Sequence, residues 1–433
     1  MTATTKFLAG SAFNLMGRGL VYVSDEDENY LRAGLYDDDP AVPYRAADIR
    51  EDGWIKVDLN QVRDPADDAD VGGFEVFNGN FPKGWTPFTT GGGALGVALF
   101  PHSGAMALSC GVSASGGSAG VAMEITARAG ETLTLNTWMM SATGGGIARV
   151  RIQNKRTGKY LAKGGWQVAP TDCQTETAPT AYVNHVKTFT VEGYDACQAD
   201  EVTLALRLYT DTTGGVVYFD DVYLYPGVNF FSMHGHNIEP RISVLWQYSA
   251  TDTAVEAPAP YTLISSHTAK EPSFYGVTAA TLYQRWIQFT FSGTPLAAPV
   301  SVGELVLGQT QTLLTDARHP ALADWQWDYL RPQVRNKRQD GGERPFNLND
   351  HPQRTLRLPY LQTSDASFEQ FRQEVRRRCQ DGAEPIVLVP DDSRPEVLFG
   401  RVPAEWTDRQ SILRSVHATD LVVVESPFGL SGL

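Results

Sequence analysis

Short runs of alternating hydrophobic and polar residues dominate the pattern along this chain. Residues 202–208 place a leucine or valine at every second position, and residues 131–140 alternate in a similar way. A period of two is typical of β-strands with one buried face. Turn-forming residues bound most of these runs, and helical periodicity is rare. The pattern therefore predicts a mainly β protein built from antiparallel sheets.

One strand pattern is interrupted by a long segment. The run 54–59 carries Ile55, Val57 and Leu59 on one face, and the runs that would complete its sheet follow only after residue 228. A length of 433 residues favours two to four domains. Domain insertions are tolerated at exposed loops of a host domain. We therefore expect a split β-sandwich over 1–65 and 228–318, with a second module inserted at 71–226.

The pattern changes again after residue 318. Segment 319–345 is polar, basic and rich in turn formers, which predicts a linker. Residues 346–433 begin with a strand-like run at 355–360. A helix is then predicted from Ser364 to a stop at Gly382, because Phe368, Phe371, Val375 and Cys379 recur at helical spacing. Further strand-like runs at 385–389, 397–402 and 421–425 would complete a small C-terminal α+β domain.

The host segment carries motifs that resemble a known family. They are W-I-x-V-D-L at 54–59, F-x-x-x-G-H-N at 231–237, R-W-I-x-F at 285–289 and G-E-L-x-L-G at 303–308. This series is similar to the discoidin-like, or galactose-binding-like, sandwich of structural proteins from tailed bacteriophages. Residues 346–430 resemble the tube-type or belt domains of phage tail proteins. The resemblance implies a virion protein of the tail tip or baseplate, synthesised in the host cytoplasm.

The insert carries its own motifs. They are F-E…G-W at 74–85, H-S-G-x-x-A-L at 102–108, G-x-T-x-T-L at 130–135 and V-Y-F-D-D-V-x-L at 217–224. These motifs resemble the jelly-roll carbohydrate-binding modules that accompany polysaccharide-degrading enzymes. The resemblance implies a structural calcium ion held by Glu75 and Asp221, since calcium prefers carboxylate and carbonyl oxygens. The alternative is that the pair Asp220 and Asp221 forms a turn or a solvated strand edge, although an inward carboxylate would still need a partner.

Candidate sugar-binding residues follow from the chemistry of saccharides. An aromatic ring packs on the apolar C–H face of a pyranose, while amides and charged groups hydrogen-bond its hydroxyl groups. The candidates in the insert are Trp138, Trp166, Tyr209, Arg151, Gln153 and Asn154. The alternative for each aromatic residue taken singly is a place in the core.

Composition and charge narrow the possible partners. A formal net charge of −14 argues against a nucleic-acid-binding surface, which needs a basic face. No run reaches the roughly 18 apolar residues of a membrane-spanning helix, and Arg18 breaks the first apolar run, so we expect no secretory leader. The four cysteines lack CxxC spacing, which predicts buried free thiols or a disulfide between Cys173 and Cys197. A metal site at His234, His236 and Asn237 is not expected, and polar capping of a strand end is the alternative.

No catalytic motif stands out. The chain has no G-x-S-x-G elbow, no H-E-x-x-H pair and no glycine-rich phosphate loop after a strand. We therefore expect a non-enzymatic structural protein that forms a symmetric ring, or a trimeric or hexameric hub, with other tail or baseplate proteins. Its inserted module would bind a host surface glycan through avidity. Two alternatives stay open: a secreted glycan-binding or glycan-hydrolysing protein with an accessory carbohydrate-binding module, and a module that only braces neighbouring subunits.

Overall fold

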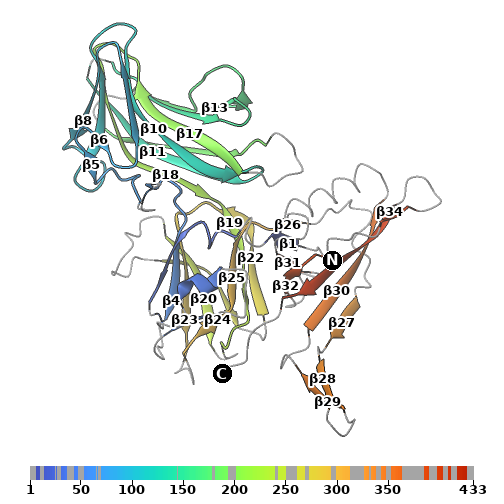
Figure 1. The fold of residues 1–433 in the computed structure, drawn as a ribbon. Helices are drawn as coiled ribbons and strands as arrows, with labels where there is room; N and C mark the ends of the chain where they lie inside the picture. Colours follow the sequence, from blue (N-terminus) through green and yellow to red (C-terminus); the bar gives the residue numbers. More distant parts are fainter. Residues whose placement is uncertain are drawn as a thin grey trace. The chain divides into compact units, whose positions relative to one another are not determined.

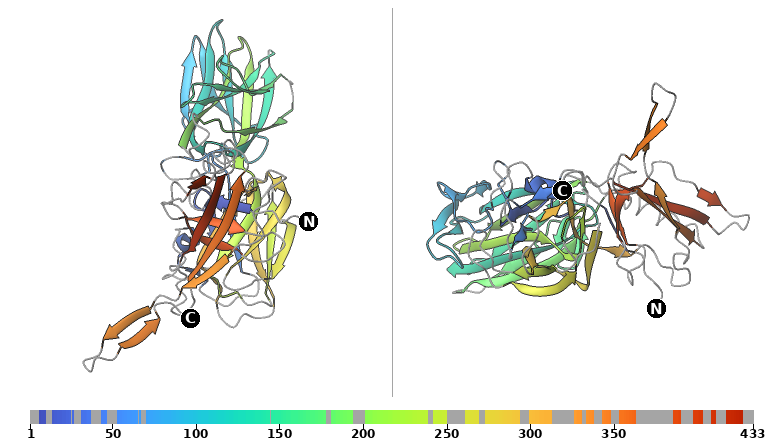
Figure 2. Two further views of the ribbon diagram at one scale, coloured as in Figure 1. Left: turned by 90° about the vertical axis from the view of Figure 1, so that its right-hand side faces the viewer. Right: turned by 90° about the horizontal axis from the view of Figure 1, so that it is seen from below.

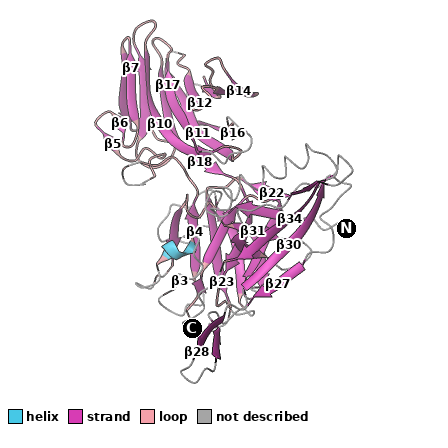
Figure 3. Cartoon of the chain, turned by 45° about the vertical axis from the view of Figure 1, so that its right-hand side comes forward, coloured by secondary structure: helices cyan, strands magenta, loops and turns pink. Residues whose placement is uncertain are grey.

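The protein is mainly β, as its sequence predicts, and its sheets are antiparallel (Figures 1 and 3). Among the described residues the single helical element is a short 3-10 helix, η1 (Arg32–Leu35), and no helix has the length and apolar character needed to cross a membrane. The computed structural model describes residues 6–9, 14–24, 26, 31–36, 43–46, 53–64, 66, 70–143, 145–177, 181–193, 201–238, 242–249, 261–268, 273–293, 299–312, 326–330, 333–337, 343–347, 353–362, 385–389, 397–402, 408–410 and 417–426.

The chain divides into two compact units, residues 59–227 and residues 1–58 together with 228–433. The first unit begins earlier than the insert predicted at 71–226, because residues 60 and 61 are bonded to the end of that unit. The Gln61 N–H donates to the Leu224 carbonyl at 2.7 Å, and the Leu224 N–H donates to Asn60 Oδ1 at 3.1 Å. The two ends of unit 59–227 therefore lie side by side.

Two facing sheets form the sandwich of the larger unit. The five-stranded sheet has the order β2 (Leu20–Val23), β4 (Trp54–Asp58), β23 (Trp286–Ser292), β20 (Ser243–Ser249) and β21 (Thr262–Thr268). The three-stranded sheet has the order β22 (Ser273–Leu282), β19 (Val228–His234) and β25 (Glu304–Gly308). A separate pair joins β3 (Tyr44–Arg45) to β24 (Ser301–Val302). Strand β4 thus pairs with β23 across more than two hundred residues of sequence.

Strand β4 is buried on both faces, which its alternation alone does not predict. Ile55 and Val57 are fully buried, and Lys56 and Asp58 are almost fully buried. Arg285 donates two hydrogen bonds to the Asp58 carboxylate, at 2.9 and 2.7 Å, and this bidentate pair neutralises the buried charge. The ammonium of Lys56 lies 4.9 Å from the ring centroid of Trp54.

The polar residues at the end of β19 satisfy hydrogen bonds of the fold. His234 is buried, and its Nε2 lies 2.8 Å from Ser232 Oγ. His236 Nδ1 accepts the Ile238 N–H at 3.2 Å, and Asn237 bridges residues 299 and 301 through its side chain. These contacts agree with the capping role that the sequence offers as an alternative to a metal site.

The C-terminal strands belong to a sheet that includes the beginning of the chain. Strand β1 (Lys6–Ala9) pairs with β31 (Ile386–Val389) and β26 (Gln311–Thr312), so the sheet crosses the domain boundary predicted near residue 346. The remaining strands are β32 (Leu398–Arg401), β34 (His417–Glu425), β30 (Gln353–Gln362), β27 (Gln326–Leu330) and β33 (Asp408–Gln410). Strands β30 and β34 run side by side over eight residue pairs (Figure 2).

Packing joins this sheet to the host sandwich. Phe230 and Val306, on the three-stranded sheet, share an apolar cluster with Val387, Val389 and Phe399 of the C-terminal strands. The helix predicted from Ser364 lies outside the described residues. The linker predicted at 319–345 instead contains β27 and most of a hairpin, β28 (Gln333–Lys337) and β29 (Glu343–Asn347), since its turn formers separate short strands.

Unit 59–227 is a second antiparallel sandwich. Its seven-stranded sheet has the order β14 (Gly165–Gln167), β13 (Tyr160–Ala162), β12 (Ala148–Asn154), β17 (Glu201–Thr210), β10 (Ser118–Arg128) and β7 (Thr86–Thr90), with β15 (Gln174–Glu176) beside β12. Its five-stranded sheet has the order β16 (Val183–Thr190), β11 (Thr132–Thr143), β18 (Val216–Pro226), β9 (Ala107–Val112) and β8 (Gly93–Ala98). A small hairpin joins β5 (Phe77–Asn78) to β6 (Phe81–Pro82).

The alternation predicted for this unit is confirmed. Val202, Leu204, Leu206 and Leu208 of β17 are all buried in one core, which Leu133 and Leu135 of β11 enter from the opposite sheet. Burying such a side chain stabilises the fold by roughly 1.5–3 kcal/mol. These buried residues fix which face of each strand points inward. The residues that alternate with them along β12 and β17 point to the outer face of the sheet.

Candidate functional site

The outer face of the seven-stranded sheet gathers long polar side chains. On β12, Val150 and Ile152 point into the core, so Arg149, Arg151 and Gln153 point outward. The register pairs Arg149 with Tyr209 and Arg151 with Arg207 of the neighbouring strand β17. We call this surface the β12–β17 face; it also includes the outward residues of β7, β10 and β13.

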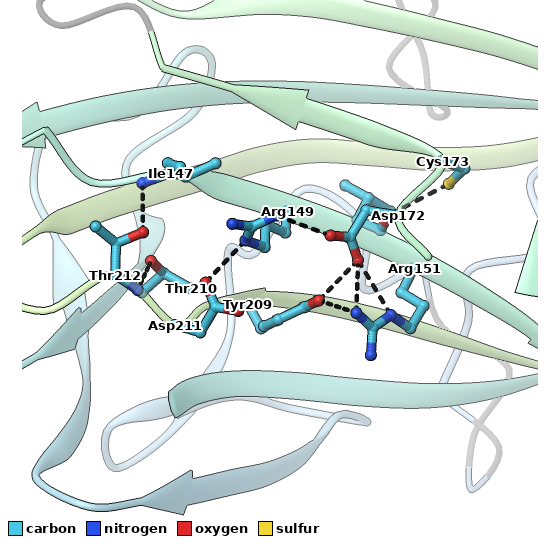
Figure 4. Close-up of polar contacts among 10 residues, drawn as sticks. Ile147, Arg149, Arg151, Asp172, Cys173, Tyr209, Thr210, Asp211 and Thr212 are labelled. Carbon is cyan, nitrogen blue, oxygen red and sulfur yellow. Dashed lines mark hydrogen bonds and ion pairs between the residues drawn. The ribbon is translucent and has the colours of Figure 1, made fainter. Parts of the chain in front are cut away.

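Asp172 is the centre of a polar cluster on the β12–β17 face (Figure 4). Its Oδ1 accepts hydrogen bonds from Arg151 Nε at 3.1 Å and from the Tyr209 hydroxyl at 2.7 Å, and its Oδ2 accepts one from Arg149 Nη1 at 3.0 Å. Arg151 also donates to the Tyr209 hydroxyl, and Arg149 Nε donates to Asp211 Oδ1 at 2.8 Å. Two arginines and a tyrosine are therefore held by one carboxylate.

Backbone pairing explains why Asp172 reaches this position. The next residue, Cys173, donates its N–H to the Val150 carbonyl at 2.9 Å, and β15 then continues alongside β12. The Asp172 side chain is only 10% exposed. Burial, together with the hydrogen bond to Asp172 and its negative charge, raises the pKa of Tyr209 well above its usual value, so its hydroxyl group remains a donor at neutral pH.

Aromatic rings line the same face. The Phe88 ring lies 6.4 Å from the Tyr209 ring, and the guanidinium carbon of Arg151 lies 5.0 Å from Tyr209 and 5.9 Å from Tyr160. Gly120 of β10 sits between Phe88 and Tyr209 in the register. A Cβ atom at residue 120 would lie 2.7 Å from Phe88 Cζ and 2.5 Å from Tyr209 Cβ, so the glycine lets both rings approach.

This arrangement suits a ligand with both hydroxyl groups and apolar C–H surfaces. Rings such as Phe88 and Tyr160 offer apolar surface beside the guanidinium groups, the two arginines held by Asp172 offer fixed hydrogen-bond donors, and Gln153 offers a free side-chain amide. Because the Asp172 cluster holds Arg149 and Arg151 in place, little side-chain entropy is lost when they bind. The face therefore has a preorganised polar centre.

The structure brings Tyr209, Arg151 and Gln153 together and separates Asn154 from them. Gln153 is half-buried, opposite Tyr160, and hydrogen-bonds no other described residue through its side chain. Asn154 is fully buried, and its Oδ1 accepts the N–H groups of residues 156 and 157 at 3.0 and 3.1 Å. Its side chain therefore forms the turn after β12, where no ligand can reach it.

Trp166 closes the edge of the sandwich. Its ring packs edge-on against Phe189 of the opposite sheet, with centroids 5.9 Å apart, and its Nε1 donates to the Thr190 carbonyl at 2.8 Å. Part of the ring also contacts the apolar core. These contacts hold the Trp166 ring against the edge of the sandwich while leaving it partly exposed, and its role in sugar binding stays a prediction.

Trp138 lies on the other sheet. Its ring stacks on the His102 imidazole, with centroids 3.5 Å apart and planes inclined by 14°, and the Tyr182 ring lies 6.0 Å from His102. Strand β11, which carries Trp138, pairs with β16 and β18 and with no strand of the β12–β17 face. Trp138 and Tyr209 therefore cannot contact one bound sugar together.

The carboxylates of Asp220 and Asp221 are both buried, although strand alternation predicts that one of them points outward. Asp221 has a left-handed φ of 46°, next to an irregular register with β11, and this turns both side chains toward residues 102–103. Asp220 Oδ2 accepts the N–H groups of His102 and Ser103 at 2.7 and 3.1 Å. Burial and the neighbouring charge of Asp221 raise the pKa of Asp220 to about 7.

These contacts bear on the calcium ion expected at Glu75 and Asp221. Asp221 Oδ1 accepts the hydroxyl groups of Ser103 and Tyr223, and its Oδ2 lies 2.6 Å from His102 Nδ1. Glu75 accepts the Ala105 N–H at 3.1 and 3.2 Å. Calcium needs six or more oxygen ligands, but N–H and O–H donors occupy these oxygens, and the described residues contain no group of three or more His, Cys, Asp or Glu that could hold a metal ion. The residues as arranged do not fit that ion.

Cys173 is a free thiol, which agrees with the prediction of free cysteines and not with a disulfide to Cys197. Its Sγ lies 3.4 Å from the Val150 carbonyl, and burial raises its pKa to about 12. Cys110 is also free and is buried in the core. Cys197 and Cys379 lie outside the described residues.

Sequence reasoning missed several residues of this face: Arg149, Asp172, Arg207, Phe88 and Tyr160. One signal was available, because Arg149, Arg151 and Gln153 form an outward row on a strand whose inward row is apolar. Asp172 carried no such signal, since it lies in a loop that only the fold brings to β12.

No protein-family model matches the chain, and no curated protein matches it. Among solved structures, a part of the chain is similar to the enzymatically active domain of bacteriophage CBA120 tailspike protein 4, with 14% identity, a TM-score of 0.28, and coverage of 39% of this chain and 21% of the tailspike chain. A second similar structure is the CBM22-1 xylan-binding domain of Paenibacillus barcinonensis Xyn10C, with 13% identity and a TM-score of 0.24; the match covers 33% of this chain and 85% of that domain. A third is a family 16 carbohydrate-binding module, with 18% identity and a TM-score of 0.24; the match covers 33% of this chain and 89% of that module.

Proposed function

We propose that this chain binds a glycan through the β12–β17 face. The observation that carries the proposal is the cluster in which Asp172 holds Arg149, Arg151 and Tyr209 beside two further aromatic rings. Fixed donors next to aromatic faces match the alternating hydroxyl and C–H surfaces of a pyranose.

We also propose that the chain is a non-enzymatic structural protein of a phage tail tip or baseplate, in which copies assemble into a ring or hub and display unit 59–227. The motifs of the host segment support this proposal. So does the insertion itself, since both ends of unit 59–227 meet at residues 60 and 224, and a module tethered at both ends is restricted in orientation. Multivalent display would turn weak sugar binding into strong attachment.

Two features support binding over hydrolysis. A glycosidase acid needs a carboxyl group that is kept protonated and touches the substrate. Both oxygens of Asp172 are bound by Arg149, Arg151 and Tyr209 of this chain. Asp220, whose pKa is raised, is fully buried against residues 102–103.

The test of glycan binding is a glycan array probed with the full chain. Phe88→Ala and Gln153→Ala, two side chains of the β12–β17 face, should each weaken the positive signals about tenfold or more. Val186→Ala, on the five-stranded sheet and 60% exposed, is the matched control and should leave them unchanged. The proposal fails if no glycan binds, or if the two face variants bind as the wild-type protein does.

The test of the structural role is electron microscopy of phage particles with a gold label at residue 113 of unit 59–227. Label on intact tails, repeated with rotational symmetry, is the expected result. Label that is absent from tails, while the chain is found outside cells and releases reducing ends from polysaccharide, would support the secreted alternative.

A further inference from the structure

Arg207 is an exposed cation at the centre of the β12–β17 face. It lies on β17, directly opposite Arg151 of β12 on one side and Ala122 of β10 on the other. Its guanidinium carbon lies 5.9 Å from the Phe88 ring centroid. It forms no ion pair and no hydrogen bond through its side chain with any other described residue.

The other charged groups around Arg207 are already paired. Arg149 contacts both Asp172 and Asp211, and Arg151 contacts Asp172. The remaining carboxylate near this position, that of Glu124 on β10, pairs with Lys155. Among the described residues of this face, Arg207 is thus the charged side chain that has no oppositely charged partner.

The strand register places the positive charge of Arg207 opposite another arginine, which destabilises the sheet when no anion is bound. Like charges placed directly opposite each other on neighbouring strands destabilise a sheet, and Arg151 and Arg207 are such a pair. Asp172 accepts from Arg151 and from Tyr209, which lies two residues along β17 from Arg207, but Arg207 itself has no hydrogen bond or ion pair to Asp172. An anion between Arg207 and Arg151 would relieve the repulsion and accept charge-assisted hydrogen bonds from both.

We infer that the glycan bound by this face is anionic, with its acid group at Arg207. The inference rests on the proposed glycan binding and names the class of saccharide. The Arg207 guanidinium lies over the Phe88 ring, which helps to hold it on this face, where it can bind a carboxylate or phosphate of the sugar. In a chain with a formal net charge of −14, binding an anion requires such a local cation, because the overall field repels it.

The experiment measures binding of the full chain to matched polymers by affinity electrophoresis and calorimetry. One pair is polygalacturonate and its fully methyl-esterified form, which share a backbone and differ in charge. The second pair is a phosphomannan and the same mannan after dephosphorylation. The first pair tests a sugar carboxylate and the second a sugar phosphate as the source of the acid group.

The variant Arg207→Gln removes the charge at an exposed position, so folding should be kept, and an unchanged melting temperature checks this. It should weaken binding to the charged polymer at least tenfold and remove most of the salt dependence of binding. Lys187→Gln, on β16 of the other sheet, changes the net charge equally and should bind as the wild type does.

The outcomes separate the inference from the proposed function. Binding to the charged member of either pair, lost in Arg207→Gln and absent for its neutral partner, supports the inference. Equal binding to both members of a pair, or binding unaffected by Arg207→Gln, overturns the inference and leaves glycan binding standing. If neither these polymers nor the glycan array gives binding, glycan recognition itself is overturned.

Discussion

At the scale of single residues, the proposed binding face depends on one carboxylate that carries no motif. Asp172 orients two arginines and a tyrosine, and without it Arg149 and Arg151 would repel each other two residues apart on one strand. The residues expected from the sequence include Arg151 and Tyr209 but not the group that positions them. Residue types can be chosen from chemistry, whereas partners brought by a loop require the fold.

Asp172→Asn should therefore weaken both the fold and the binding. Asparagine keeps the shape but lacks the charge that holds two partly buried guanidinium groups, so we expect a loss of roughly 1–3 kcal/mol in the free energy of unfolding, measured by denaturant titration of the full chain. Asp211→Asn is the control, because that side chain is 48% exposed and its ion pair contributes at most about 1 kcal/mol. Equal effects of the two substitutions would contradict the central role of Asp172.

Acid should destabilise the larger unit through His234. Burial, and then the nearby His236 and Arg354, lower the pKa of His234 well below its usual value, and burial lowers that of His267. The folded state then binds fewer protons than the unfolded state, so the stability from these neutral rings is full above about pH 6.5 and falls as the pH drops below it.

Calorimetry of the full chain between pH 8 and pH 5 measures this effect. The melting temperature of one transition should fall with pH, and His234→Gln, which can keep a hydrogen bond to Ser232, should flatten that dependence. A wild-type profile that is flat over this range would show that the buried histidines are not linked to folding.

At the scale of elements, alternation identifies strands but does not say which sheet they join. The runs in β11 and β17 are both read correctly from the sequence. Trp138 and Tyr209 are both on outward positions of their strands, although neighbouring side chains leave Tyr209 only 6% exposed. The two strands belong to opposite sheets, and so the two aromatic residues cannot form one site. Likewise the polar run 319–345 looks like a linker, yet its strands pair with partners that are distant in sequence or lie across a turn.

Gly120→Ala tests the packing of β10 against β17. A Cβ at this residue would lie 2.3 Å from the Leu208 carbonyl oxygen, which cannot move without breaking the sheet. We expect a loss of about 1–3 kcal/mol in stability, with weaker glycan binding as Tyr209 is displaced. Gly96→Ala in β8, where the nearest atom would be 4.0 Å away, should cost little in denaturant unfolding. Equal stability of the two variants would contradict the close approach at Gly120.

At the scale of the whole molecule, the insertion decides how the chain is organised. The interruption of the strand pattern after residue 59 is visible in the sequence, but the exact ends of the unit follow from hydrogen bonds between residues 60–61 and 224. The C-terminal sheet is harder to foresee, because β1 and β31 are separated by almost the whole chain and pair only in the folded state.

A fragment of residues 59–227 should fold alone. Its ends lie side by side and its core is shared by its own two sheets. We expect a single cooperative transition by calorimetry and a β-type circular dichroism spectrum. A fragment that is unfolded in isolation would mean that unit 59–227 depends on the rest of the chain.

The most direct test of the central claim is carbene footprinting of the full chain with and without a glycan that binds it. If the β12–β17 face is the site, protection will fall on peptides containing residues 149–153 and 203–209, and Val97 and Val186 of the other sheet will be labelled equally in both states. Protection confined to the five-stranded sheet around Trp138 and Tyr182, with residues 149–153 unchanged, would contradict the account.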